Sequence, residues 1–118
     1  MAAKGMPALS WKRRMREAQL LRAMKRTLQD AFGDRLRGVV LFGSRARGDG
    51  GPDSDLDLLV LLEAPVRLGE DLERTIVALY PLQLECEQPI HAVPVDFRTF
   101  ESGEFGWYRH AKDEGVYL

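Results

Sequence analysis

A run of five consecutive apolar residues, at positions 58–62, constrains the fold of this chain more than any other sequence feature. A strand with one face in water alternates apolar and polar residues, whereas a strand covered on both faces is apolar throughout. We therefore predict a strand over residues 56–62 that lies inside the protein, with helices packed on both faces of its sheet. Such a layered arrangement is typical of the α/β class.

Apolar residues that recur every three or four positions predict a long helix near the start of the chain. They are Trp11, Met15, Ala18, Leu21, Met24 and Leu28. Ser10 is a candidate N-cap for this helix, and Gly33 is a natural stop. Residues 1–9 precede the helix and are expected to be flexible.

Two further helices are expected downstream of the buried strand. The first is marked by Leu68, Leu72, Ile76 and Leu79. Pro81 should disturb its end, because proline removes a helical N–H donor. The second covers about residues 104–114 and stops at Gly115. Residues 82–86 alternate apolar and polar side chains, which fits either a short strand or a frayed helix end.

Two more strands are expected, over residues 36–42 and 90–95. The first leads into Gly43, and the loop that follows is rich in Gly, Ser, Asp and Pro, with one short helical turn at residues 44–47. Pro94 lies within the other strand and argues for an edge position, since proline has no donor for a ladder on both sides. At 118 residues, the chain is expected to form a single domain, residues 1–118.

The composition argues against several classes of protein. Cys86 is the only cysteine, so no intramolecular disulfide can form, and one cysteine with two histidines argues against a zinc site. No apolar run approaches the roughly 18 residues that span a bilayer, and no signal peptide is evident. A cytoplasmic location is the resulting expectation.

The net charge of −1 conceals a split along the chain. Residues 1–52 carry 12 Lys and Arg against 4 Asp and Glu, a balance of +8, whereas residues 53–118 carry 5 against 14, a balance of −9. Such asymmetry can mark a surface for a charged partner. It equally fits a basic, solvated helix packed on an acidic body, and both interpretations stay open.

The residues that point to chemistry begin at the Gly43-Ser44 turn. A strand that ends in a tight turn at Gly43 lets backbone N–H groups approach a ligand. Ser44 adds a hydroxyl donor, and a helical turn that starts there would present free N–H groups to an anion. Arg45 and Arg47 add positive charge nearby.

Asp55 and Asp57 stand two positions apart at the start of the buried strand, which puts both carboxylates on one face. Two adjacent carboxylates repel each other unless a cation neutralises them. Mg²⁺ suits them, because it takes hard oxygen ligands and completes its coordination with waters and substrate phosphates. A phosphate-binding turn beside a dicarboxylate metal site predicts phosphoryl or nucleotidyl transfer.

Other phosphate-binding and metal-binding motifs fit less well. No Gly-Lys-Ser/Thr follows Gly43 at Walker A spacing, and no G-x-G-x-x-G fingerprint follows the strand. Residues 53–64 begin like an EF-hand loop, but they place Leu58 and Ala64 where that loop requires Gly and Glu. The remaining alternative is that Asp53 and Asp55 are turn residues and that Gly43 simply turns the chain.

At these residues the chain resembles the DNA polymerase beta superfamily of nucleotidyltransferases, whose signature is a Gly-Ser turn followed by Asp-x-Asp ahead of an apolar strand. The form LFGSRARG…SDLDLLV and the short length resemble the minimal nucleotidyltransferases of bacteria and archaea. The resemblance is strong over residues 36–62. It extends more weakly to the ending Glu114-Gly115-Val116-Tyr117-Leu118.

The resemblance implies a nucleotidyltransferase fold, with a small mixed sheet of three to five strands flanked by helices. It assigns Gly43 and Ser44 to the triphosphate, and it assigns Asp55 and Asp57 to catalysis through Mg²⁺ or Mn²⁺. Arg47 is expected to join the nucleotide site. The implied substrate is a nucleoside triphosphate, first of all ATP. The implied partner is a helical HEPN-type protein encoded alongside, which such antitoxins neutralise and some members modify with AMP.

One departure from the family pattern concerns a third carboxylate, which the superfamily usually carries on the third strand. Alignment of AVPVDFRTF with that pattern places Val93 at its position, and a shift of two places His91 there. Asp96 has the opposite parity and lies near the strand end. Because the third acid assists deprotonation of the attacking hydroxyl, its absence puts catalytic rate in doubt more than nucleotide binding.

Two functions therefore compete. A metal-dependent nucleotidyltransferase is favoured by the complete Asp pair, and a weakly active or inactive module that binds a HEPN-type partner is favoured by the absent third acid and the small size. Nucleic-acid binding through the basic first helix ranks last, because no aromatic platform accompanies its charges. Trp107, Tyr108 and His110 are expected to serve packing or a partner surface.

Overall fold

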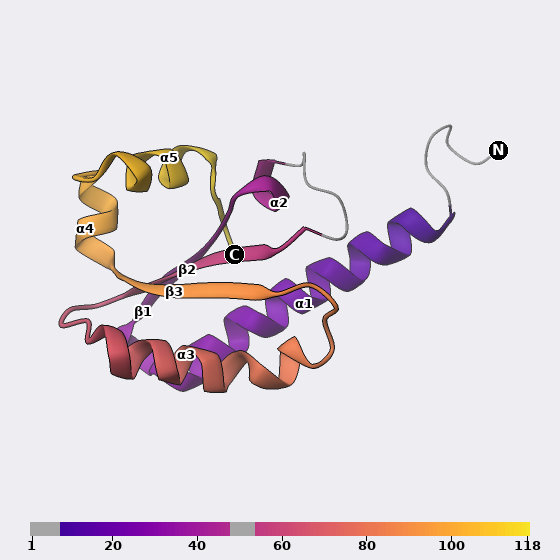
Figure 1. Cartoon of the computed structure of the whole chain (residues 1–118), viewed down its shortest axis with the longest axis horizontal. Helices are drawn as coiled ribbons and strands as arrows, with labels where there is room; N and C mark the ends of the chain where they lie inside the picture. The colour runs from indigo at the N-terminus through magenta and orange to yellow at the C-terminus, as the bar shows by residue number, and fades with distance from the viewer. Residues whose placement is uncertain (1–7, 48–53) are drawn as a thin grey trace.

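The computed structural model describes residues 8–47 and 54–118, with side chains described from Met15 onward, and shows a sheet with helices on both faces (Figure 1). The helices are α1 (Ala8–Phe32), α2 (Ser44–Arg47), α3 (Leu68–Gln83), α4 (Phe97–Ser102) and α5 (Gly106–Glu114), with a 3-10 turn, η1 (Gly33–Arg35), after α1. The strands are β1 (Leu36–Phe42), β2 (Leu56–Leu62), β3 (Ile90–Asp96) and β4 (Val116–Tyr117). No helix in these two ranges combines the length and the apolar character that a membrane span needs.

The strands form a mixed sheet in the order β3-β2-β1-β4. β1 runs antiparallel to both β2 and β4, whereas β2 and β3 run parallel and are joined through α3. β3 therefore lies at an edge, as Pro94 predicted, since an edge strand tolerates a residue without an N–H donor. The mixed sheet flanked by helices confirms the predicted fold class.

β2 is buried on both faces of the sheet, which confirms the prediction from its apolar run. Its even-numbered residues pack beneath α1 and α3, in a core that also contains Met24, Leu28, Phe32, Val39, Leu41 and Leu79. Leu59 and Leu61 pack beneath α4 and α5, with Val40, Val95, Phe100 and Ala111. The sheet thus has an α1/α3 face and an α4/α5 face, and the parity of a residue in β2 decides which face it serves.

α1 begins earlier than predicted and packs on the sheet over only part of its length. It starts at Ala8, so Ser10 lies inside its first turn and is not its N-cap. Met24 is buried, but Met15 is 52% exposed, because the first part of α1 extends past the sheet (Figure 1). Gly33, with a φ of 58°, ends the helix as predicted. The side chain of Trp11 and residues 1–7 lie outside the described part.

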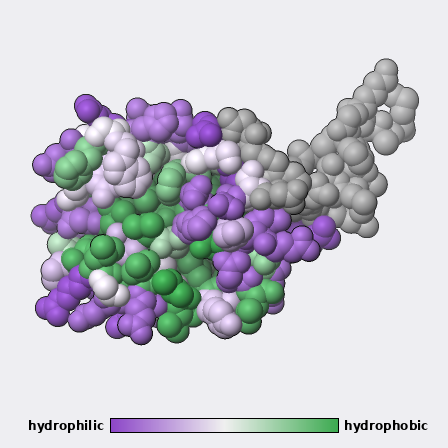
Figure 2. Space-filling view, in the orientation of Figure 1, coloured by the Kyte–Doolittle hydropathy of each residue, from purple (hydrophilic) through white to green (hydrophobic). Residues whose placement is uncertain are grey.

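α3 confirms the predicted helix, but only part of its predicted apolar face is buried. Asp71, Thr75 and Leu79 are buried, whereas Leu68 and Ile76 are exposed. The exposed side carries an apolar stripe, which we call the α3 stripe and which consists of Ile76, Val77, Tyr80 and Leu84. Figure 2 shows apolar residues gathered over β3 and α3 on this side of the molecule, with polar residues along the margins.

The end of α3 settles the assignment that the sequence left open. The helix continues through Pro81 to Gln83, and turns lead on toward β3, so residues 82–86 form no strand. The predicted last helix is present as α5. Two short elements, α4 and β4, were not predicted from the sequence.

Candidate functional site

Gly43 is the residue at which the predicted turn and the predicted carboxylates meet. Its φ is +78°, a left-handed conformation that residues with a side chain rarely adopt. A Cβ atom on Gly43 would also lie only 2.7 Å from Oδ2 of Asp57. Two separate conditions therefore require glycine here, and its missing side chain lets the Asp57 carboxylate approach the turn directly.

Asp57 lies between two neighbouring strands near one end of the sheet. It pairs with Phe42 of β1 on one side and with His91 of β3 on the other. As an odd-numbered residue of β2 it belongs to the α4/α5 face. His91 shares that face and approaches Asp55, with 3.1 Å between Nε2 and Oδ2. The two aspartates and the imidazole therefore gather at the end of this face that adjoins Gly43.

The carboxyl group of Asp57 has a raised pKa. Partial burial is the main cause, because it penalises the charged form. The charge of His91 acts in the opposite direction and lowers the pKa, and the negative charge of Asp55 raises it. A cation bound by the two carboxylates would relieve both the burial of charge and the repulsion.

The donor set at this place fits a hard divalent cation whose coordination is completed by other ligands. In the described residues, no group of three or more His, Cys, Asp or Glu side chains is arranged to hold a metal ion. Mg²⁺, however, is commonly bound through one or two carboxylates, with waters and substrate phosphates supplying the other oxygens. Asp55 and Asp57 could hold Mg²⁺ or Mn²⁺ in this way, together with a substrate that carries phosphates.

The predicted helical turn after Gly43 is present as α2. It begins at Ser44, and the N–H of Arg47 donates to the carbonyl of Gly43 at 3.1 Å. The guanidinium group of Arg47 lies 3.7 Å from a carboxylate oxygen of Glu114, at the end of α5. This ion pair connects the turn to the helices on the α4/α5 face.

The register of β3 decides which residue stands at the place expected for a third carboxylate. His91 lies opposite Asp57, whereas Val93 lies two residues farther along the strand, opposite Leu59. Asp96 is at the other end of β3, where its carboxylate accepts a hydrogen bond from the N–H of Thr99 at 3.0 Å and caps α4. The neighbour of the aspartate pair is therefore an imidazole, and the one carboxylate in β3 has a structural role.

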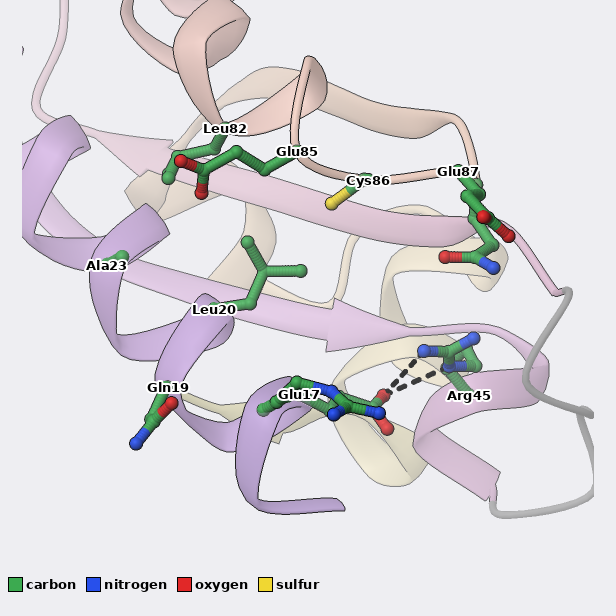
Figure 3. Close-up of a pocket in the computed structure, with 11 residues that line it drawn as sticks. Glu17, Gln19, Leu20, Ala23, Arg45, Leu82, Glu85, Cys86 and Glu87 are labelled. Carbon is green, nitrogen blue, oxygen red and sulfur yellow. Dashed lines mark hydrogen bonds and ion pairs between the residues drawn. The ribbon is translucent and has the colours of Figure 1, made fainter. Parts of the chain in front are cut away.

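A cavity of about 830 Å³ lies on the α1/α3 side, between α1, α2 and the segment after α3 (Figure 3). Its lining does not include Gly43 or Asp57. Arg45 forms part of the wall, contacts Glu17 at 2.9 Å and donates to the carbonyl of Ser54 at 3.0 Å. The guanidinium group of Arg45 thus connects α1 to the chain before β2. The sequence had suggested only that Arg45 adds positive charge near the Gly43 turn.

Comparison with protein families identifies the segment that carries this site. The model of a family described as nucleotidyltransferase domain matches residues 21–118. The matched segment contains the Gly43 turn, both aspartates and all four strands of the described sheet.

Individual relatives are similar at different levels. Over 52 residues the chain is 36% identical to a protein of Methanocaldococcus jannaschii named "Putative protein adenylyltransferase". This segment covers 44% of the chain and 52% of that relative, so the chain spans about half the length of the curated relative it matches. The crystal structure of a "putative nucleotidyltransferase" from Sulfolobus solfataricus has a TM-score of 0.61 and 18% identity, over 98% of this chain and 90% of that one. At such low identity the likeness shows the fold alone.

Proposed function

The chain belongs to the nucleotidyltransferase domain family, and on that basis we propose that it transfers a nucleoside monophosphate from a nucleoside triphosphate to an acceptor. The observation that carries this proposal is the approach of Asp57 to Gly43, where a Cβ atom would lie 2.7 Å from the carboxylate. A turn that can receive phosphate oxygens thereby stands beside a carboxylate that can hold a metal ion.

The reaction forms a bond between an acceptor hydroxyl oxygen and the α-phosphorus of the nucleotide. The bond from that phosphorus to the pyrophosphate leaving group breaks, and the proton of the acceptor hydroxyl passes to water. A bound divalent cation would supply neutralisation of the charge on the phosphate oxygens. In our proposal Asp55 and Asp57 hold that cation, Gly43 and Ser44 hold the triphosphate, and Arg47 stands at the end of the same turn.

We further propose ATP as the nucleotide and a protein as the acceptor. This choice is supported by the name of the M. jannaschii relative, a protein adenylyltransferase by description, of which the chain spans about half. The Gly43 turn and the aspartate pair would contact only the phosphates and the metal. The identities of the nucleobase and the acceptor therefore do not follow from them.

The proposed activity should be slow in this protein. His91 stands opposite Asp57, where the family pattern leads us to expect a carboxylate. The imidazole of His91 lies 3.1 Å from Asp55. It is therefore not placed like a carboxylate that would assist deprotonation of the acceptor. Binding of the triphosphate and metal depends on the aspartates and the turn, so it should persist.

Pyrophosphate release from Mg²⁺-ATP, in the presence of a protein acceptor, tests this function. The matched variant is Asp57→Asn, which removes one charge at almost constant shape. Release by the wild type should depend on the metal and be lost in Asp57→Asn, while circular dichroism shows that the fold persists. Release that survives in Asp57→Asn would place the chemistry elsewhere.

A second candidate function is the binding of a helical HEPN-type partner, and the α3 stripe favours it. Ile76, Val77, Tyr80 and Leu84 are between 57% and 69% exposed, so an apolar surface is open along this helix. Acidic residues stand close by in the chain, Glu73 before the stripe and Glu85 after it, which would favour a partner with basic flanks. Co-elution of the neighbouring gene product with the wild type but not with Ile76→Glu, in the absence of pyrophosphate release, would favour this function over transfer.

A further inference from the structure

The last residue of β1 carries an aromatic ring between the carboxylate site and α5. Phe42 packs against the core of the α4/α5 face. It is also the cross-strand partner of Asp57, and directly opposed side chains on one face of a sheet are neighbours. The ring of Phe42 lies 6.1 Å from the ring of Trp107, between centroids. Phe42 is therefore a neighbour of the indole of Trp107 through its ring and of Asp57 through the strand pairing.

Trp107 lies near the start of α5, and residues at both ends of this helix contact the rest of the protein. The ring of Tyr108, the next residue, lies 6.0 Å from that of Phe100, which is fully buried. At the other end of α5, Glu114 lies 3.7 Å from Arg47 of α2. The helix is thus fixed to both the core and the turn, and a binding group on a fixed element keeps its geometry better than one on a loop.

The surface around this ring is open. Trp107 is 50% exposed. At the neighbouring carboxylates, the side chains of His91 and Asp55 are 56% and 49% exposed. An indole offers a large, flat apolar surface, which stacks well on the face of another aromatic ring. A half-exposed indole at the border of an open, charged site therefore has the chemistry of a platform for a nucleobase.

We propose that Trp107 binds the nucleobase of the substrate by stacking, while the Gly43 turn holds the triphosphate. This inference rests on the proposed function, because it requires the phosphates to lie at that turn. Stacking uses a π face that all bases share, so Trp107 should raise affinity for nucleotides without selecting one base strongly.

Calorimetry with two ligands separates the base from the phosphates. Mg²⁺-ATP carries both, whereas Mg²⁺-tripolyphosphate carries only the phosphates. Trp107→Leu removes the stacking surface but keeps an apolar contact for Phe42, and it should weaken ATP binding about tenfold and leave tripolyphosphate binding unchanged. Trp107→Tyr keeps an aromatic face and should retain most of the ATP affinity.

Phe105→Leu is the matched control. Phe105 is also 50% exposed and flanks the same helix, but its ring packs edge-on against Tyr108 at 5.5 Å. It should bind both ligands as the wild type does. A second readout uses Trp11→Phe, which leaves Trp107 as the only one of the two tryptophans. Its fluorescence should fall on addition of Mg²⁺-ATP and stay constant with Mg²⁺-tripolyphosphate.

The outcomes distinguish this inference from the proposed function. Unchanged ATP affinity in Trp107→Leu would overturn the stacking role and leave the proposed function standing. An equal loss of ATP and tripolyphosphate affinity would overturn it as well, since the variant would then have disturbed the turn. If the wild type binds neither ligand, the proposed function fails and the inference fails with it.

Discussion

At the scale of single residues, the site holds two carboxylates close together, and the charge of His91 offsets only part of the cost to Asp57. Asp57 is partly buried next to Asp55, and its raised pKa records the resulting unfavourable environment of the carboxylate. The absence of a side chain at Gly43 allows this carboxylate to approach the turn. Such arrangements are expected where function is selected at some expense of stability.

Asp57→Asn should make the ligand-free protein more stable at pH 7. A pKa that is raised in the folded state means that folding favours the protonated carboxyl group. That contribution is fully present below the ordinary pKa of about 4 and is lost as the pH rises through the raised value. Thermal melts in EDTA should therefore show a gap in favour of asparagine that opens between about pH 4 and pH 7. A wild type that melts higher at pH 7 would argue against this account of Asp57.

His91→Asp should accelerate transfer. The register places residue 91 opposite Asp57, so a carboxylate there could assist deprotonation of the acceptor. General-base assistance typically raises the rate by about 10²–10⁴. Val93→Asp is the matched control, because it adds the same carboxylate to the same strand face two residues farther along β3. Single-turnover pyrophosphate release at saturating Mg²⁺-ATP measures both. An equal gain in both variants, or a wild type that already turns over on the order of tens per second, would show that the base lies elsewhere.

At the scale of elements, the sequence predicted those that carry their own periodic signal. The apolar run of β2 and the three- and four-residue spacing in α1 and α3 are signals of this kind. β4 has two residues, Val116 and Tyr117, and exists through its pairing with Val40 and Leu41, so no local pattern could reveal it. α4 has six residues and follows β3 without a loop. The sequence feature that marks its start is the N-cap Asp96. From the sequence alone, Asp96 is only a candidate for the third carboxylate.

The buried face of α3 shows the same limit. Asp71 is only 4% exposed, because Arg35 neutralises it through two contacts of 2.9 and 3.0 Å and the N–H of Arg67 donates to it at 2.9 Å. Arg35 stands 36 positions earlier in the chain. A pattern that counts apolar residues assigns an aspartate to the solvent, and only the tertiary partner reverses that assignment.

Asp71→Asn should lower the free energy of unfolding by about 1–3 kcal/mol. The hydrogen bonds from Arg35 are the main reason that the pKa of Asp71 is lowered. Its contribution is present above the ordinary carboxyl pKa of about 4 and is lost as the pH falls through the lowered value. Urea unfolding at pH 7 measures the effect. Glu63→Gln is the control, because its ion pair with Arg37 is at the surface and should contribute less than about 1 kcal/mol. Comparable losses in both variants would contradict the role given to Asp71.

At the scale of the whole molecule, the sheet sorts the chain into two sides (Figure 1). The long helices α1 and α3 cover one face, and the shorter α4 and α5 leave the end near Asp57 open on the other. The aspartate pair could be predicted because it adjoins the unambiguous apolar run of β2, and the Gly43 turn because Gly-Ser directly follows the predicted strand over residues 36–42. The sequence offered both Val93 and His91 as neighbours of the pair, and only the register of β3 selects His91. The position of Trp107 beside Phe42 could not be predicted, since it depends on the docking of α5.

The measurement that tests the central claim most directly is calorimetry of ATP binding with and without a divalent metal. The claim is that Asp55 and Asp57 hold a metal-bound nucleoside triphosphate against the Gly43 turn. The wild type should bind ATP in Mg²⁺ or Mn²⁺ and lose that binding in EDTA, and Asp57→Asn should fail to bind in either condition while remaining folded. Equal ATP affinity with and without EDTA, or metal-dependent binding that survives Asp57→Asn, would contradict it.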